Sequence, residues 1–120
     1  MHEVLTRELA DDPTVDITTT GRQTGLLRRI EIWMMDVDGR YFITGTPGRR
    51  DWLANLRANP WLVIHLTRGA PLDLPARVEE VVDPATRRMV FEHLVSRWYA
   101  TQTPIDELIA NAPMVEVFVD

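Results

Sequence analysis

The chain has 120 residues, of which 45% are hydrophobic and 26% are charged, and its net charge at neutral pH is −5. These values are typical of one soluble domain over residues 1–120 with a single core, and the acidity argues against the broad basic surface that nucleic-acid binding requires. Cysteine is absent and all 13 basic residues are arginine, which excludes disulfides, thiol catalysis, cysteine-bound metals and any mechanism that needs a lysine Schiff base.

The first part of the sequence predicts a short helix followed by strands. The helix is expected from His2 to Leu9, within residues 1–12, because its apolar residues share one face. Runs with β-branched residues or alternating polarity predict three strands, at Thr14 to Thr20, Leu26 to Val37 and Arg40 to Thr44. Asp38-Gly39, between the last two strands, is typical of a tight hairpin turn with positive φ at both positions.

The rest of the chain predicts three helices and three strands. A short helix is expected from Asp51 to Asn59, with Asp51 as its cap. The strands are expected at Trp61 to Thr67, which is apolar on both faces and therefore central, and at Leu72 to Val82 and Met114 to Val119. Further helices begin at Asp83-Pro84, with an apolar face reaching Trp98, and at Thr103-Pro104. About six strands with peripheral helices predict a mainly β (α+β) fold, a small antiparallel barrel.

Positive charge gathers in one stretch of this acidic chain. Seven arginines and four acidic residues lie between Gly21 and Pro60. Three of these arginines lie in two glycine-containing loops, Gly21-Arg22-Gln23-Thr24-Gly25 and Gly45-Thr46-Pro47-Gly48-Arg49-Arg50, and Arg28 closely follows the first loop. Glycine lets a backbone approach a ligand closely, and guanidinium groups bind phosphate or carboxylate through paired hydrogen bonds. The loops therefore predict a site for an anionic small molecule.

The same two loops carry a family resemblance. The run Thr18-Thr19-Thr20-Gly21-Arg22-Gln23-Thr24-Gly25 with Arg28, and the later Gly45 to Trp52 and Asn55 to Pro60, resemble the deazaflavin-dependent nitroreductases in order and spacing. Members of this family are split β-barrel oxidoreductases that use coenzyme F-420. The resemblance implies a split barrel whose groove holds the deazaflavin, with the anionic phosphate and glutamyl tail against the basic loops.

The resemblance also assigns expected roles to individual residues. Those in the positions where the family binds its cofactor are Arg22, Gln23, Arg28, Thr46, Pro47, Gly48, Arg49, Arg50, Trp52 and Asn55. On the late helix, where the family places tyrosines that face the substrate, we expect Trp98 and Tyr99 to border the opening for the electron acceptor. Gln23 stands where the family usually has lysine or arginine, so one charge contact to the glutamyl tail is missing.

The expected activity is hydride transfer from reduced coenzyme F-420 to a small electron-poor acceptor such as a quinone, nitro compound or enone. No acid–base pair stands out, and the chemistry would belong to the cofactor. Two alternatives remain open: an FMN-dependent oxidoreductase of the related pyridoxamine-phosphate-oxidase-like barrels, and a non-catalytic carrier of flavin, haem or a fatty acid in the same groove. FMN has a single phosphate, so Gln23 slightly favours these alternatives.

The remaining features set limits on partners and location. The three histidines show no ligand spacing, so no metal site is expected. No apolar run approaches the roughly 18 residues that span a bilayer, and the N-terminus does not resemble a signal peptide, so a cytoplasmic protein is expected. The sequence leaves open whether the barrel is monomeric or forms a homodimer.

Overall fold

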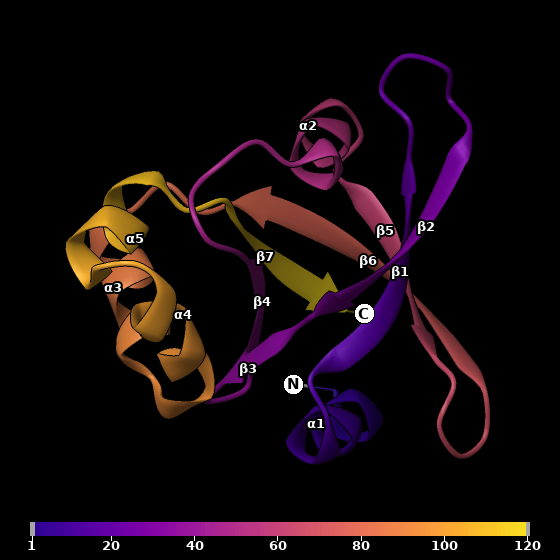
Figure 1. Ribbon diagram of the computed structural model, residues 1–120. Helices are drawn as coiled ribbons and strands as arrows, with labels where there is room; N and C mark the ends of the chain where they lie inside the picture. The colour runs from indigo at the N-terminus through magenta and orange to yellow at the C-terminus, as the bar shows by residue number, and fades with distance from the viewer. Residues whose placement is uncertain (1, 120) are drawn as a thin grey trace.

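The computed structural model describes residues 2–119 and contains one curved antiparallel sheet with five α-helices around it (Figure 1). The strands are β1 Thr14–Thr20, β2 Leu27–Trp33, β3 Met35–Val37, β4 Arg40–Thr44, β5 Trp61–Leu66, β6 Leu72–Glu80 and β7 Met114–Val119. The helices are α1 Glu3–Asp11, α2 Asp51–Ala58, α3 Pro84–Glu92, α4 Arg97–Gln102 and α5 Ile105–Asn111, with a 3₁₀ turn at Leu94–Ser96. Their order in the sheet is β2-β1-β5-β6-β7-β4-β3.

The sheet curls into a barrel because one predicted strand bends. The expected strand Leu26 to Val37 divides at Met34, so that β2 pairs with β1 at one end of the strand order and β3 pairs with β4 at the other. The Met34 side chain is fully buried, and its backbone N–H donates to the Pro13 carbonyl at 2.9 Å. The bend gives seven strands rather than six and leaves β2 as a sheet edge. The split antiparallel barrel expected from the sequence is confirmed.

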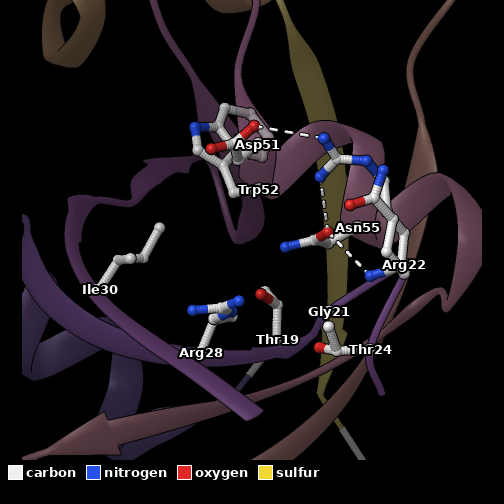
Figure 2. A pocket seen from close by; sticks show the side chains of 10 residues that line it. Thr19, Gly21, Arg22, Thr24, Arg28, Ile30, Asp51, Trp52 and Asn55 are labelled. Carbon is white, nitrogen blue, oxygen red and sulfur yellow. Dashed lines mark hydrogen bonds and ion pairs between the residues drawn. The ribbon is translucent and has the colours of Figure 1, made fainter. Parts of the chain in front are cut away.

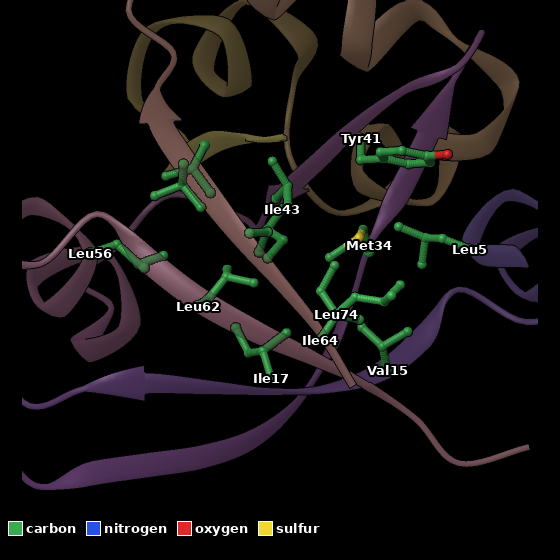
Figure 3. Close-up of a cluster of buried hydrophobic side chains, with 14 of the residues drawn as sticks. Leu5, Val15, Ile17, Met34, Tyr41, Ile43, Leu56, Leu62, Ile64 and Leu74 are labelled. Carbon is green, nitrogen blue, oxygen red and sulfur yellow. The ribbon is translucent and has the colours of Figure 1, made fainter. Parts of the chain in front are cut away.

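The inside of the barrel is filled by alternate residues of its strands (Figure 3). Ile17 of β1 and Ile64 of β5 are paired on these neighbouring strands, and both side chains are fully buried. Helix α1 closes one end with Leu5, and α2 adds Leu56 from another side. The predicted N-terminal helix is thus confirmed, and the His2 side chain caps it by accepting a hydrogen bond from the Leu5 N–H.

Helices α3 to α5 form a layer on the outside of the sheet and bury a second apolar cluster with β3, β4 and β7 (Figure 1). The single helix expected from Asp83 to Trp98 is wrong, because α3 ends at Glu92 and His93 takes an extended conformation before α4 begins. The His93 ring accepts a hydrogen bond from the Val95 N–H, which caps the new turn.

The outer face of β5 is not covered by a helix. Burial alternates along the strand, and Trp61 at its start is 63% exposed. The expectation that Trp61 to Thr67 is buried on both faces is therefore wrong, although β5 does lie inside the strand order. Between residues 2 and 119 no helix is long and apolar enough to cross a membrane.

Candidate functional site

The arginine-containing β1–β2 turn and helix α2 enclose a cavity of about 340 Å³ beside the free edge of β2 (Figure 2). Thr19 pairs with Arg28, and Ile17 pairs with Ile30, across the two strands. Because strand side chains alternate between faces, Thr19, Arg28 and Ile30 share the inner face with buried Ile17. Helix α2 supplies the opposite wall with Trp52 and Asn55.

The structure brings half of the expected cofactor-binding residues together in this cavity, namely Arg22, Gln23, Arg28, Trp52 and Asn55. An adjoining groove of about 430 Å³ is lined by Gly48, Arg49 and Arg50, and shares Arg22 and Asp51 with the first cavity.

Thr46 and Pro47 line neither of these two hollows. The binding roles of all ten residues remain predictions.

The sequence assigned no individual binding role to five further residues that line the cavity, although Gly21 and Thr24 belong to the first predicted loop: Thr19, Gly21, Thr24, Ile30 and Asp51. Strand alternation could have found Thr19 and Ile30, because both share a face with Arg28. The expectation that Asp51 caps α2 is wrong. Arg50 occupies the cap position without a side-chain hydrogen bond, and the Asp51 carboxylate instead lies 3.4 Å from the Arg22 guanidinium.

Three polar groups that line the cavity have no hydrogen-bond partner among residues 2–119: the Arg28 guanidinium, the Thr19 hydroxyl and the Nδ2 amide of Asn55. Asn55 is only 6% exposed, and Figure 2 shows its amide nitrogen pointing into the cavity toward Arg28 and Thr19. Arg28 is exposed, and neither the Thr19 hydroxyl nor the Asn55 Nδ2 is a fully buried atom, so all three donors are open to a ligand in the cavity. This convergence of donors therefore fits a ligand with several acceptor oxygens, such as a phosphate.

The second loop is built around Arg50. Its Nη2 donates to the Thr46 carbonyl at 2.9 Å, and the guanidinium packs against the bare Cα atoms of Gly45 and Gly48. A Cβ at these two positions would lie 3.0 and 3.1 Å from the guanidinium, and φ at Gly48 is +137°. The positive φ of Gly48 requires glycine there, whereas a side chain at Gly45 would have to displace the end of the Arg50 side chain. Arg50 stabilises the loop, whereas the neighbouring Arg49 side chain is exposed and makes no hydrogen bond or ion pair within the described chain.

Trp98 and Tyr99, the residues expected near an acceptor, line neither hollow and belong to an aromatic cluster with Trp33. The Trp33 ring centroid lies 5.4 Å from that of Trp98 and 6.3 Å from that of Tyr99, and both pairs are edge-to-face. Trp98 is 47% exposed, whereas Tyr99 is buried. Burial raises the pKa of Tyr99 to about 12, and the positive charge of Arg50 partly opposes this shift. The Tyr99 phenol is therefore neutral at physiological pH.

The raised pKa of Tyr99 predicts a loss of stability in alkali. Between the ordinary tyrosine pKa of about 10 and the folded value of about 12, the unfolded chain loses the phenol proton and the folded protein keeps it. The stabilising contribution is therefore complete below pH 10 and is lost as the pH rises toward 12. We compare the free energy of unfolding of Tyr99→Phe with that of the wild type. Between pH 8 and pH 11 this difference should change by about 1 kcal/mol in favour of the variant. Urea denaturation at the two pH values tests this, and an unchanged difference would contradict the burial effect.

Comparisons with solved structures find this fold in proteins with different stated roles. The heme storage protein HutZ from Vibrio cholerae superposes with a TM-score of 0.69 at 16% identity, covering 98% of this chain and 88% of HutZ. A Clostridium acetobutylicum protein of the pyridoxinephosphate oxidase family, related to general stress protein 26, gives a TM-score of 0.73 at 16% identity, covering 97% and 81%. An F420-H2 dependent reductase, FDR-A, gives 0.60 at 21% identity, covering 91% and 95%. Identities this low establish the fold alone.

The family comparison is more specific. No curated protein sequence matches this chain significantly. The family model for F420H(2)-dependent quinone reductase, however, matches residues 2–110 and so includes both arginine-containing loops and α4. The protein therefore belongs to the F420H(2)-dependent quinone reductase family of oxidoreductases, and its cofactor is coenzyme F-420, as predicted from the two loops.

Proposed function

We propose that this protein transfers a hydride from reduced coenzyme F-420 to a small electron-poor acceptor, of which a quinone is the first candidate and a nitro compound or enone the next. The observation that carries the proposal is the cavity between the β1–β2 turn and α2. The cavity brings together hydrogen-bond donors that have no partner within residues 2–119, the Arg28 guanidinium among them, and a wall formed by Trp52. The chain also belongs to an F420H(2)-dependent family.

The residues present fit the anionic part of the cofactor. Arg28, Thr19 and the Asn55 amide would hold the phosphate, because together they offer donors without an acceptor on the protein. The adjoining groove, with Gly48 and exposed Arg49, would take the glutamyl tail. Trp52 would shield the bound ring from water. The cofactor supplies the hydride chemistry, and the protein contributes binding, orientation and a dry wall.

The acceptor side is proposed at the aromatic cluster. Trp98 offers a half-exposed ring, and Trp33 stands nearly perpendicular to it at 73°. Two rings in this arrangement give a planar aromatic acceptor an apolar surface to pack against. The neutral Tyr99 phenol, whose pKa burial raises to about 12, keeps its proton as a hydrogen-bond donor at neutral pH.

Acceptor kinetics test this function. The protein should accelerate the oxidation of reduced F-420 by menadione well above the rate of free cofactor, with saturation in menadione. Trp98→Ala should lower kcat/KM for menadione about tenfold through the loss of apolar contact area. Cofactor affinity should stay within about twofold, because Trp98 lines neither cavity of the cofactor site. Arg7→Met, an exposed change on α1, is the control for surface effects.

The same assay, together with cofactor titrations, tests the two alternative functions. Rates no better than those of free cofactor across quinones, nitro compounds and enones would leave a carrier protein. Tighter binding of FMN than of F-420 would favour an FMN-dependent enzyme of the same fold. Equal losses of cofactor affinity and acceptor turnover in Trp98→Ala would contradict the separate acceptor site.

A further inference from the structure

The guanidinium of Arg22 is already used by the protein. Its Nη1 donates to the Asn55 Oδ1 at 2.9 Å, and its Nη2 lies 3.4 Å from the Asp51 carboxylate. The Arg22 backbone N–H donates to the same Asn55 oxygen at 3.1 Å. Figure 2 shows these contacts crossing from the β1–β2 turn to helix α2. Arg28, on the facing strand, has no comparable contact with residues 2–119.

These contacts fix which way the Asn55 amide points. Oδ1 accepts two N–H groups from Arg22, and a flipped amide would set its own NH₂ against both of these donors. Asn55 is 6% exposed, so water cannot readily replace the missing acceptor. The NH₂ group must therefore face the cavity, where no acceptor from the described chain meets it.

The charges agree with this division between the two arginines. Arg22 is partly neutralised by Asp51, whose carboxylate belongs to the cavity wall. An anion that bound Arg22 directly would have to compete with that carboxylate and with the Asn55 oxygen. Arg28 needs no such exchange, because its guanidinium has no partner within residues 2–119.

We infer that Arg22 is a positioning residue, which holds the Asn55 amide with its N–H groups toward the ligand and does not itself bind the anion. The inference rests on the proposed function for the identity of the ligand, coenzyme F-420. It replaces the sequence-based expectation that Arg22 contacts the phosphate. The direct anion contact then comes from Arg28, with Asn55 as a neutral donor whose direction Arg22 sets.

A double-mutant cycle on F-420 affinity tests the inference, with fluorescence quenching as the readout. Arg22→Met and Asn55→Ala should each weaken binding about tenfold, the loss expected for one well-placed hydrogen bond to a charged group. The double variant should be no weaker than Asn55→Ala alone, because Arg22 acts through that side chain. Arg22→Met should also keep the wild-type salt dependence of binding, whereas Arg28→Met should flatten it. Additive losses, or a flattened salt dependence in Arg22→Met, would overturn the inference.

A second readout needs no cofactor. In the free protein, ¹⁵N relaxation should show a rigid Asn55 side-chain amide, and Arg22→Met should lower its order parameter by about a third. Arg28→Met and the surface control Arg7→Met should leave that order parameter unchanged. An equally rigid Asn55 amide in Arg22→Met would refute the positioning role. If the wild type fails to bind F-420, the proposed function fails, and the relaxation result still decides the role of Arg22.

Discussion

Replacing Arg87 with methionine should lower the free energy of unfolding by about 3 to 5 kcal/mol, the largest stability effect expected from any arginine of this protein. Arg87 is only 7% exposed, and its guanidinium donates to four backbone carbonyls, those of Val81, Leu108, Ile109 and Ala112. Methionine fills much of the space but leaves the carbonyls of Val81, Ile109 and Ala112 without this donor, and each such group costs about 1 to 3 kcal/mol. The Leu108 carbonyl still accepts the Ala112 N–H at 3.0 Å.

The location of Arg87 explains why the loss should affect the whole helical layer. Three of its acceptors lie at the C-terminal end of α5 and in the link to β7, and the fourth follows β6. Arg87 itself belongs to α3, so one side chain connects both helices to two strands. Burial lowers the pKa of Arg87, but a guanidinium stays protonated at any working pH. The contribution should therefore be constant between about pH 5 and 9.

Arg88→Met is the matched control for Arg87→Met, because it changes the next residue of the same helix. Arg88 is half exposed, and its contacts with Glu92 and Asp106 are long, at 3.6 and 3.8 Å. Exposed pairs of this kind contribute about 0 to 1 kcal/mol. In urea denaturation the midpoint of Arg87→Met should be clearly lower than that of Arg88→Met. Equal midpoints would show that the carbonyl contacts of Arg87 do not stabilise the fold.

Local patterns in the sequence predicted the elements whose causes are local. Asp38-Gly39 predicted a tight hairpin, and both residues have positive φ, at 52° and 91°. Asp83 was expected to cap α3, and its carboxylate accepts a hydrogen bond from the Thr86 N–H at 3.0 Å. In each case a few neighbouring residues determine the geometry, so the signal does not depend on the rest of the chain.

The bend at Met34 depends instead on contacts between distant segments. A strand that continues and a strand that changes partners have the same alternating pattern, because alternation reports only which side chains face the core. At Met34 the chain leaves β1 and joins β4, and the Pro13 carbonyl accepts the Met34 N–H. The sequence thus predicted a barrel but not how its sheet closes.

The candidate site shows the same limit. The sequence located the positive charge, but it could not say which guanidinium groups the protein itself uses. Arg22 binds Asn55, and Arg50 binds the Thr46 carbonyl, so these two hold parts of the site in place. Arg28 has no such contact within the described chain, and its predicted role is therefore the most direct.

Arg28→Met should weaken F-420 binding by about 1.5 to 3 kcal/mol, or roughly 10- to 150-fold, if its guanidinium makes a charge-assisted hydrogen bond to the phosphate. Arg29→Met is the matched control. Arg29 is the next residue on β2, faces the opposite side of the strand and pairs with Asp16 at 3.0 Å. It should change cofactor affinity less than twofold. Equal losses in the two variants would place the phosphate elsewhere.

The dependence of cofactor affinity on salt and on cofactor charge distinguishes the loss of a direct contact from a change in folding. Screening acts over about 8 to 10 Å at ordinary ionic strength, so wild-type affinity for the polyanionic F-420 should fall as salt rises. FMN carries a single phosphate and should bind more weakly, with a shallower salt dependence. Arg28→Met should weaken the binding of both cofactors by a similar factor, because it removes a charge that both phosphates use and leaves the tail contacts of F-420 in place. Gln23→Lys adds a charge at the rim of the same cavity and should tighten F-420 more than FMN. FMN binding as tight as that of F-420 in the wild type would mean that the arginine loops do not recognise the glutamyl tail.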